Sequence, residues 1–195
     1  MISKLCQAIK LDRQAVAIVK TYTPPEKALQ FRAGSTGCVI AMLSAASKGR
    51  TAVFQESTTG CPGGKAGLGF VKMNPDSIAD FLSVGNEKQS GEFYKKTPSL
   101  AATYVNSLPE TTPLPCVVFY PLDQLPVEEI PVSVVFLVNA DQLSGLITLA
   151  NFDRDTQDNV VVHFGSGCSQ AILYSMCDSE AGKDLCTVGI TDPSG

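Results

Sequence analysis

Residues 15–54 read AVAIVKTYTPPEKALQFRAGSTGCVIAMLSAASKGRTAVF. The apolar, β-branched run at 15–20 predicts a strand. After a loop that contains two adjacent prolines, residues 38–48 predict a helix that ends at Gly49. Residues 51–54 return to a strand pattern. This strand–helix–strand order indicates a fold in which helices pack on a sheet.

The rest of the chain continues this alternation. Further strands are predicted at 116–120, 132–138, 160–164 and 185–190, and further helices at 1–11, 74–84, 97–108, 141–150 and 168–176. Strands that alternate with helices predict an α/β or α+β domain with a layered sheet and helices. A chain of 195 residues without a long linker suits one domain, which we place at residues 1–195.

Two short motifs resemble each other. STGC (residues 35–38) and GSGC (residues 165–168) each open a predicted helix that leads to a strand. Each helix also follows an apolar strand at some distance. This similarity predicts two pseudo-duplicated halves. Chance is the alternative, because Ser and Gly are common before any helix.

The composition excludes several classes of protein. Hydrophobic residues make up 44% of the chain and charged residues only 17%, against about 25% charged in a typical soluble domain. A disordered chain is therefore excluded, and burial on more than one face is favoured. The net charge of -4 leaves no basic footprint for nucleic acid. The low charge fraction also leaves apolar surface that would suit a homodimer.

The termini and apolar runs predict a cytoplasmic protein without a membrane partner. Charges interrupt the N-terminal stretch before a secretory signal forms. The most apolar run, residues 132–138, is too short to cross a bilayer. In a reducing compartment, seven cysteines argue against a disulfide framework. Free thiols, a metal site or a reactive thiol remain.

The glycine-rich stretch TTGCPGGKAGLG covers residues 58–69. It differs from a phosphate-binding P-loop, because only three residues separate Gly60 from Gly64 and Ala66 follows the lysine. ATP or GTP hydrolysis is therefore excluded. Consecutive glycines still let backbone N–H groups converge on an anion, and the alternative is a tight turn that needs positive φ. The candidate ligand residues here are Gly60, Gly63, Gly64 and Lys65.

The GSGC motif follows a predicted strand and opens a helix. The third glycine of a dinucleotide-binding fingerprint would fall at Gln170, so we favour a helix N-terminus that accepts a small anion. The only histidine, His163, lies in the strand before the motif. We interpret it as a structural residue, with a Cys–His catalytic pair as the alternative. The candidate ligand residues here are Gly165, Ser166 and Gly167.

Four cysteines occupy unusual positions. Cys38 and Cys168 fall at predicted helix N-termini, where the helix dipole favours the thiolate. Cys61 lies in the glycine-rich stretch, and Cys186 lies in the last predicted strand. If the fold brings these four thiols together, they could hold an iron–sulfur cluster or zinc. The alternative is isolated structural thiols, as we interpret Cys6, Cys116 and Cys177.

Several of these motifs together resemble a known family. The order is VAIVK, GCVIAMLSAASKG, TTGCPGGKAGLGF, VVFYPL, VSVVFLVNADQL, GSGCSQA and LCTVGITDPSG. This order resembles the uncharacterised ArCR family (domain of unknown function 169) of anaerobic bacteria and archaea. The resemblance brings no assigned activity. It implies cysteines at Cys38, Cys61, Cys168 and Cys186, and an anaerobic setting that suits metal or redox chemistry.

These observations predict a binding domain and no particular reaction. The leading expectation is a site for a metal centre or a small anionic ligand, built around Cys61 and the two helix-opening motifs. One alternative is an enzyme or redox protein that uses a thiolate. Another is a non-catalytic module that forms homo-oligomers.

Overall fold

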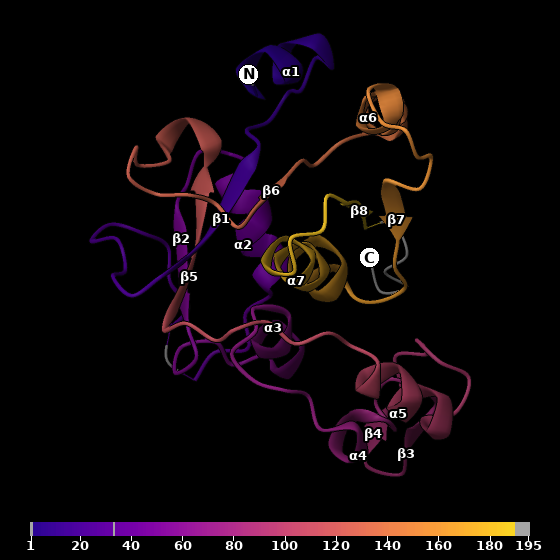
Figure 1. The fold of residues 1–195 in the computed structure, drawn as a ribbon. Coiled ribbons are helices and arrows are strands. Elements are labelled where there is room, and N and C mark those ends of the chain that lie inside the picture. The colour runs from indigo at the N-terminus through magenta and orange to yellow at the C-terminus, as the bar shows by residue number, and fades with distance from the viewer. Residues whose placement is uncertain (1, 33, 190–195) are drawn as a thin grey trace.

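A computed structural model describes residues 2–32 and 34–189. Its centre is a four-stranded antiparallel sheet with the strand order β2–β5–β1–β6 (Figure 1). The bounds of these strands are β1 (Val16–Thr21), β2 (Ala52–Gln55), β5 (Cys116–Pro121) and β6 (Ser133–Val135). The predicted combination of a layered sheet with helices is confirmed.

Most of the helices and the smaller strands lie to one side of this sheet, on its right in Figure 1. The α-helices are α1 (Ile2–Ala8), α2 (Val39–Ala46), α3 (Pro62–Gly67), α4 (Pro75–Ile78), α5 (Pro98–Asn106), α6 (Ala140–Phe152) and α7 (Tyr174–Glu180). A short 3-10 turn, η1 (Leu122–Gln124), follows β5, and a π-helical segment, η2 (Ser169–Leu173), runs directly into α7. The remaining strands are β3 (Gly85–Asn86), β4 (Gln89–Ser90), β7 (Val160–Val162) and β8 (Cys186–Val188).

The two central strands are buried on both faces. β1 pairs with β5 so that Val19 lies opposite Val118. On one face of the sheet, Ile18 packs in a cluster with Leu43 of α2 and Met176 of α7. On the other face, Val19 and Val118 belong to a second cluster, which loop residues cover. Because side chains alternate along a strand, β1 and β5 need apolar residues at every position in the core, which contributes to the low charge fraction.

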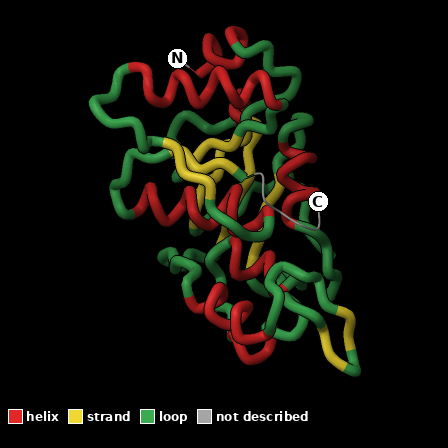
Figure 2. Tube along the Cα trace, turned by 90° about the vertical axis from the view of Figure 1, so that its right-hand side faces the viewer, coloured by secondary structure: helices red, strands yellow, loops and turns green. Residues whose placement is uncertain are grey.

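A small lobe, residues 74–106, lies away from the sheet and contains α4, β3, β4 and α5 (Figure 1). The helix predicted at 74–84 is shorter than expected, because α4 ends at Ile78. The chain then turns into a hairpin, where Gly85 has a φ of +77° and a Cβ would lie 2.5 Å from the carbonyl oxygen of Gln89. Figure 2 shows this hairpin projecting from the molecule.

At the opposite end of the molecule, α1 and α6 lie side by side (Figures 1 and 2). The side-chain amide of Gln142 in α6 donates hydrogen bonds to the carbonyl oxygens of Ile9 (3.2 Å) and Lys10 (3.0 Å), just after α1. No residue of α6 is fully buried. Within the described residues, no helix has the length and apolar character that a membrane crossing requires.

The two helix-opening motifs stand in different settings. The helix after STGC leads to β2, which belongs to the four-stranded sheet. The helix after GSGC leads to β8, which pairs in parallel with β7 in a separate two-stranded sheet. The segments predicted to be pseudo-duplicated therefore end in different sheets.

Candidate functional site

The glycine-rich stretch contains a helix, α3, that the sequence did not predict. Cys61 caps α3, and its sulfur accepts a hydrogen bond from the backbone N–H of Gly64 at 3.4 Å. A Cβ on Gly60 would overlap the carbonyl oxygen of Ser35, and one on Gly64 would lie 2.8 Å from Val39. These glycines therefore let the stretch pack closely against the STGC motif.

The same stretch also packs against the GSGC motif. A Cβ on Gly67 would lie 2.5 Å from the Cβ of Cys168. The residues just before α3, next to Cys61, therefore pack against the STGC motif, which contains Cys38. The end of α3 packs against Cys168. Gly63 differs, because a Cβ there would meet nothing within 4 Å. Lys65 lies in α3 and is half-buried.

The four predicted thiol ligands lie on different segments of the described structure. Across residues 2–32 and 34–189, no three His, Cys, Asp or Glu side chains form a group that could hold a metal ion. Cys186 lies in β8, where it pairs with Val160. Desolvation of the sulfur and the nearby Asp184 raise the pKa of the Cys186 thiol, whereas Arg154 acts in the opposite direction. The predicted iron–sulfur or zinc site therefore receives no support from the positions of Cys38, Cys61, Cys168 and Cys186.

The GSGC motif starts a helix as predicted. The helix begins at residue 167, and the hydroxyl oxygen of Ser166 accepts a hydrogen bond from the backbone N–H of Ser169 at 3.4 Å. A Cβ on Gly165 would lie 2.5 Å from Oγ of Ser169 and closer still to Oη of Tyr104. Only glycine fits at this position without movement of its neighbours.

Three hydroxyl groups meet at this turn. Oγ of Ser169 lies 3.2 Å from Oγ of Ser166 and 3.4 Å from Oη of Tyr104. Ser169 is buried and also donates to the carbonyl oxygen of Ser166 at 2.9 Å. Ser169 begins the π-helical segment η2, and π-helical turns occur frequently at functional sites.

Aromatic rings and a lysine adjoin the hydroxyl groups. The ring of Phe164 meets the rings of Tyr104 and Tyr94 edge to face, with centroids 5.7 and 6.4 Å apart. Nζ of Lys95 lies 3.9 Å from the centroid of Phe164 and 5.4 Å from that of Tyr104. Tyr94, Lys95 and Tyr104 carry no recognisable motif in the sequence, because nothing local relates the small lobe to residue 164.

His163 has a structural partner. Its ring stacks on the ring of Tyr174, with centroids 3.8 Å apart and planes at 6°. Its carbonyl oxygen accepts a hydrogen bond from the side-chain amide of Gln170 at 2.9 Å. The interpretation of His163 as a structural residue agrees with this stacking.

A second polar cluster lies at the end of β1. The side chain of Lys20 is 4% exposed; its ammonium forms an ion pair with Glu180 and donates to Oγ of Thr111 at 2.8 Å. Glu180 also accepts hydrogen bonds from Thr111 (2.7 Å) and from the backbone N–H of Thr112 (3.0 Å). Burial alone would raise the pKa of Glu180, but these partners outweigh it and hold that pKa below its ordinary value.

Burial and the carboxylates of Glu180 and Asp178 raise the pKa of the neighbouring Cys177 to about 11. A thiol in this state is protonated at neutral pH and is a poor nucleophile. The interpretation of Cys177 as a structural residue agrees with this.

Comparison with known proteins adds one finding. No curated protein and no solved structure matches the chain. The family model of the uncharacterised ArCR proteins (domain of unknown function 169) matches residues 4–195, nearly the whole chain. The motifs at STGC, at the glycine-rich stretch and at GSGC all lie inside this match, and the chain therefore belongs to the uncharacterised ArCR family.

Proposed function

We propose that this chain is a binding protein for a small anionic compound, whose anionic group is held at the GSGC turn. The observation that carries this proposal is the cluster of three hydroxyl groups from Tyr104, Ser166 and Ser169 at the start of a helix. A hydroxyl group can rotate to exchange a hydrogen bond within the protein for one to a ligand, and the N–H groups of a helix start carry partial positive charge. Together they suit an oxyanion such as phosphate or carboxylate.

Lys95 supports the choice of an anion. Its ammonium lies over the face of Phe164, next to the turn, where the negative face of the ring attracts it. The ion pairs found among the described residues do not involve Lys95. Within the part of the chain that the structure describes, its positive charge therefore lies beside the turn without a carboxylate that pairs with it.

Gly165 supports the same location. Because it lacks a Cβ, the backbone at the turn approaches Ser169 and Tyr104 directly. An anion that accepts hydrogen bonds from these hydroxyl groups would therefore also lie near the backbone of the turn.

The proposal is tested by an NMR titration of the isotope-labelled chain with inorganic phosphate, and in parallel with acetate. We expect the amide resonances of residues 165–169 to shift in a saturable manner. Replacing Lys95 by Met should weaken binding roughly fivefold, because it removes one charge-assisted contact. The acetate arm shows whether the site prefers phosphate or carboxylate.

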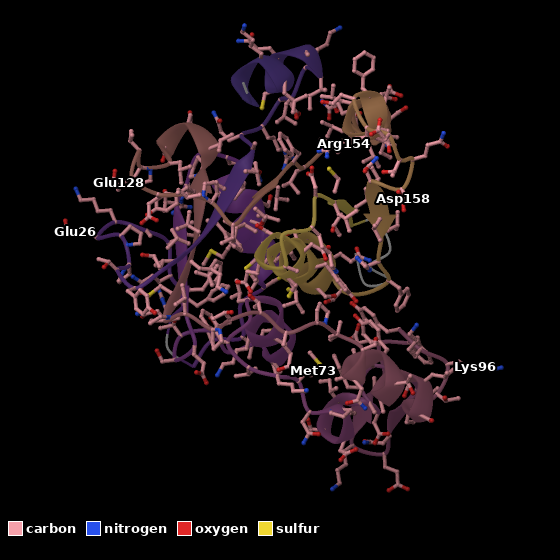
Figure 3. The ribbon with its side chains drawn as sticks, in the orientation of Figure 1. Glu26, Met73, Lys96, Glu128, Arg154 and Asp158 are labelled. Atoms are coloured by element: carbon pink, nitrogen blue, oxygen red, sulfur yellow. The ribbon has the colours of Figure 1, made fainter. Side chains whose placement is uncertain are left out.

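The matched control is Lys96→Met. Lys96 is exposed, and its side chain points away from the molecule at the outer edge of the small lobe (Figure 3). This variant should bind phosphate like the unmodified chain. Equal weakening by Lys95→Met and Lys96→Met, or unshifted resonances at the turn, would contradict the proposal.

A further inference from the structure

A second candidate site lies where the small lobe meets α3 and η2. It is a pocket of about 140 Å³ between the end of α3, the C-terminal part of α5, the segment 109–113 and the last residue of η2. Its apolar walls come from Ala66, Phe70, Met73, Val105, Leu108 and Leu173. None of the residues of the GSGC turn lines it, so it is separate from the site proposed above.

The size and lining of the pocket define what its interior accepts. An apolar protein cavity of about 150 Å³ holds one benzene molecule. The pocket is therefore large enough for a single aromatic ring or a short branched alkyl chain. Apolar walls favour such a group, because its transfer from water buries apolar surface.

The mouth of the pocket carries one charge of each sign. Lys72 and Glu110 both line the pocket and form an ion pair with each other. Their side chains are 66% and 63% exposed. An exposed pair of this kind contributes little stability, so a ligand can replace its internal contact at small cost.

The third polar residue at the pocket is already committed. Oγ of Thr111 accepts from Lys20 and donates to Glu180. The side chains available to a ligand's polar groups are therefore the ammonium of Lys72 and the carboxylate of Glu110.

We propose that this pocket binds a small zwitterion with an apolar side chain, of the type of an aliphatic or aromatic amino acid. The apolar side chain enters the pocket, the ligand's carboxylate pairs with Lys72, and its ammonium pairs with Glu110. One exposed ion pair is exchanged for two pairs beside an apolar wall, where water screens them less.

Calorimetric titration of the full chain with three probes tests this proposal. The probes share a phenyl ring: L-phenylalanine carries both charges, phenylpropanoate only the carboxylate, and phenethylamine only the ammonium. We expect L-phenylalanine to bind most tightly and each analogue to bind roughly tenfold more weakly, because each loses one charged contact.

Two variants assign the charges to residues. Lys72→Met should weaken L-phenylalanine and phenylpropanoate but leave phenethylamine unchanged. Glu110→Gln should weaken L-phenylalanine and phenethylamine but leave phenylpropanoate unchanged. The matched controls, Lys88→Met and Glu87→Gln, change exposed residues between β3 and β4 that do not line the pocket. Neither control should alter any of the three affinities.

A filled pocket gives an independent test. Ala66→Leu enlarges a buried side chain in the wall and should abolish binding of L-phenylalanine, while circular dichroism verifies the fold. The proposal is overturned if L-phenylalanine shows no saturable binding, or if either analogue binds as tightly. Because Lys95→Met should leave this binding unchanged, failure here and failure of the proposed anion site are distinguishable.

Discussion

Gly165 controls how closely two hydroxyl groups approach the backbone at the GSGC turn. A Cβ at this position would lie 2.5 Å from Oγ of Ser169 and would also overlap Oη of Tyr104. We therefore expect Gly165→Ala to lower the free energy of unfolding by about 1–3 kcal/mol, the usual cost of forcing an extra carbon into a packed site. Chemical denaturation measures the change.

Gly145→Ala is the control for this substitution. Gly145 lies in α6, and a Cβ there would meet nothing within 4 Å. Alanine favours a helix over glycine by about 1 kcal/mol, so this variant should be as stable as the unmodified chain or more stable. Equal stability of Gly165→Ala and Gly145→Ala would show that the turn has room for a side chain.

The Lys20–Glu180 pair makes stability depend on pH. Folding lowers the pKa of Glu180 below its ordinary value of 4.5. Its contribution is therefore complete above that value and is lost as the pH falls through the lower pKa of the folded state. Denaturant unfolding at a series of acidic pH values should show this loss, and the Glu180→Gln variant should show a shallower one.

Lys20→Met tests the same pair at neutral pH. The Lys20 side chain is 4% exposed, whereas that of Glu180 is 28% exposed and can recover some contact with water. We therefore expect a loss of about 2 kcal/mol, below the usual cost of breaking a fully buried pair. Lys72→Met removes an exposed lysine and should change stability by less than about 1 kcal/mol. Similar losses in both variants would argue against burial as the cause.

Residues whose environment is local could be identified from the sequence, and the others could not. Ser166 and Gly165 are recognisable because a short Gly/Ser motif before an apolar helix is a local signal. Lys95 and Tyr104 adjoin the turn only because the small lobe places them there. No spacing within the chain reports that placement.

At the level of elements, helix starts were the most predictable feature. Asn74 and Thr97, the first residues of the helices predicted at 74–84 and 97–108, are the caps of α4 and α5, since each side chain accepts a hydrogen bond from a backbone N–H of its helix. The helix α3 was missed because a run with three glycines is intrinsically a poor helix former. Its glycines instead allow close packing against STGC and Cys168. Tertiary contact thus outweighs local propensity there.

The cap of α5 matters because this helix carries Tyr104 and Val105, one at each proposed site. Thr97 accepts a hydrogen bond from the N–H of Leu100 at 3.3 Å. Thr97→Ala should cost about 1 kcal/mol in thermal or chemical unfolding. Thr103→Ala, on the exposed side of the same helix, should have little effect. A larger effect of Thr103→Ala would contradict the capping role.

At the level of the whole molecule, the sequence could not show which distant segments of the chain lie together. Cys186 and Cys38 each lie where a sequence pattern places them, in a strand and at a helix start. The strand that carries Cys186 joins β7 in a separate two-stranded sheet instead of the central sheet. Strand partners depend on the whole topology and not on the local pattern. The sequence around Cys186 therefore could not show whether its thiol lies near the other three.

Stability should be distributed unevenly over the molecule. The paired residues of β1 and β5 are buried in two clusters, whereas β3 and β4 form a hairpin of two residues each with little burial. Hydrogen–deuterium exchange should therefore be slowest in β1 and β5 and fast in the hairpin. Equal exchange rates in peptides that cover 116–121 and 85–90 would contradict this distribution.

The position of β1 in the sheet also constrains how the chain is made. Both neighbours of β1, the strands β5 and β6, come from the second half of the chain. As the chain emerges from the ribosome, Ile18 and Val19 must remain without strand partners until residues beyond 115 have been synthesised. Pairing then closes a long loop, which is characteristic of slow folding. This largely apolar strand thus stays exposed while about 100 further residues are synthesised, which makes it a segment that a chaperone would protect.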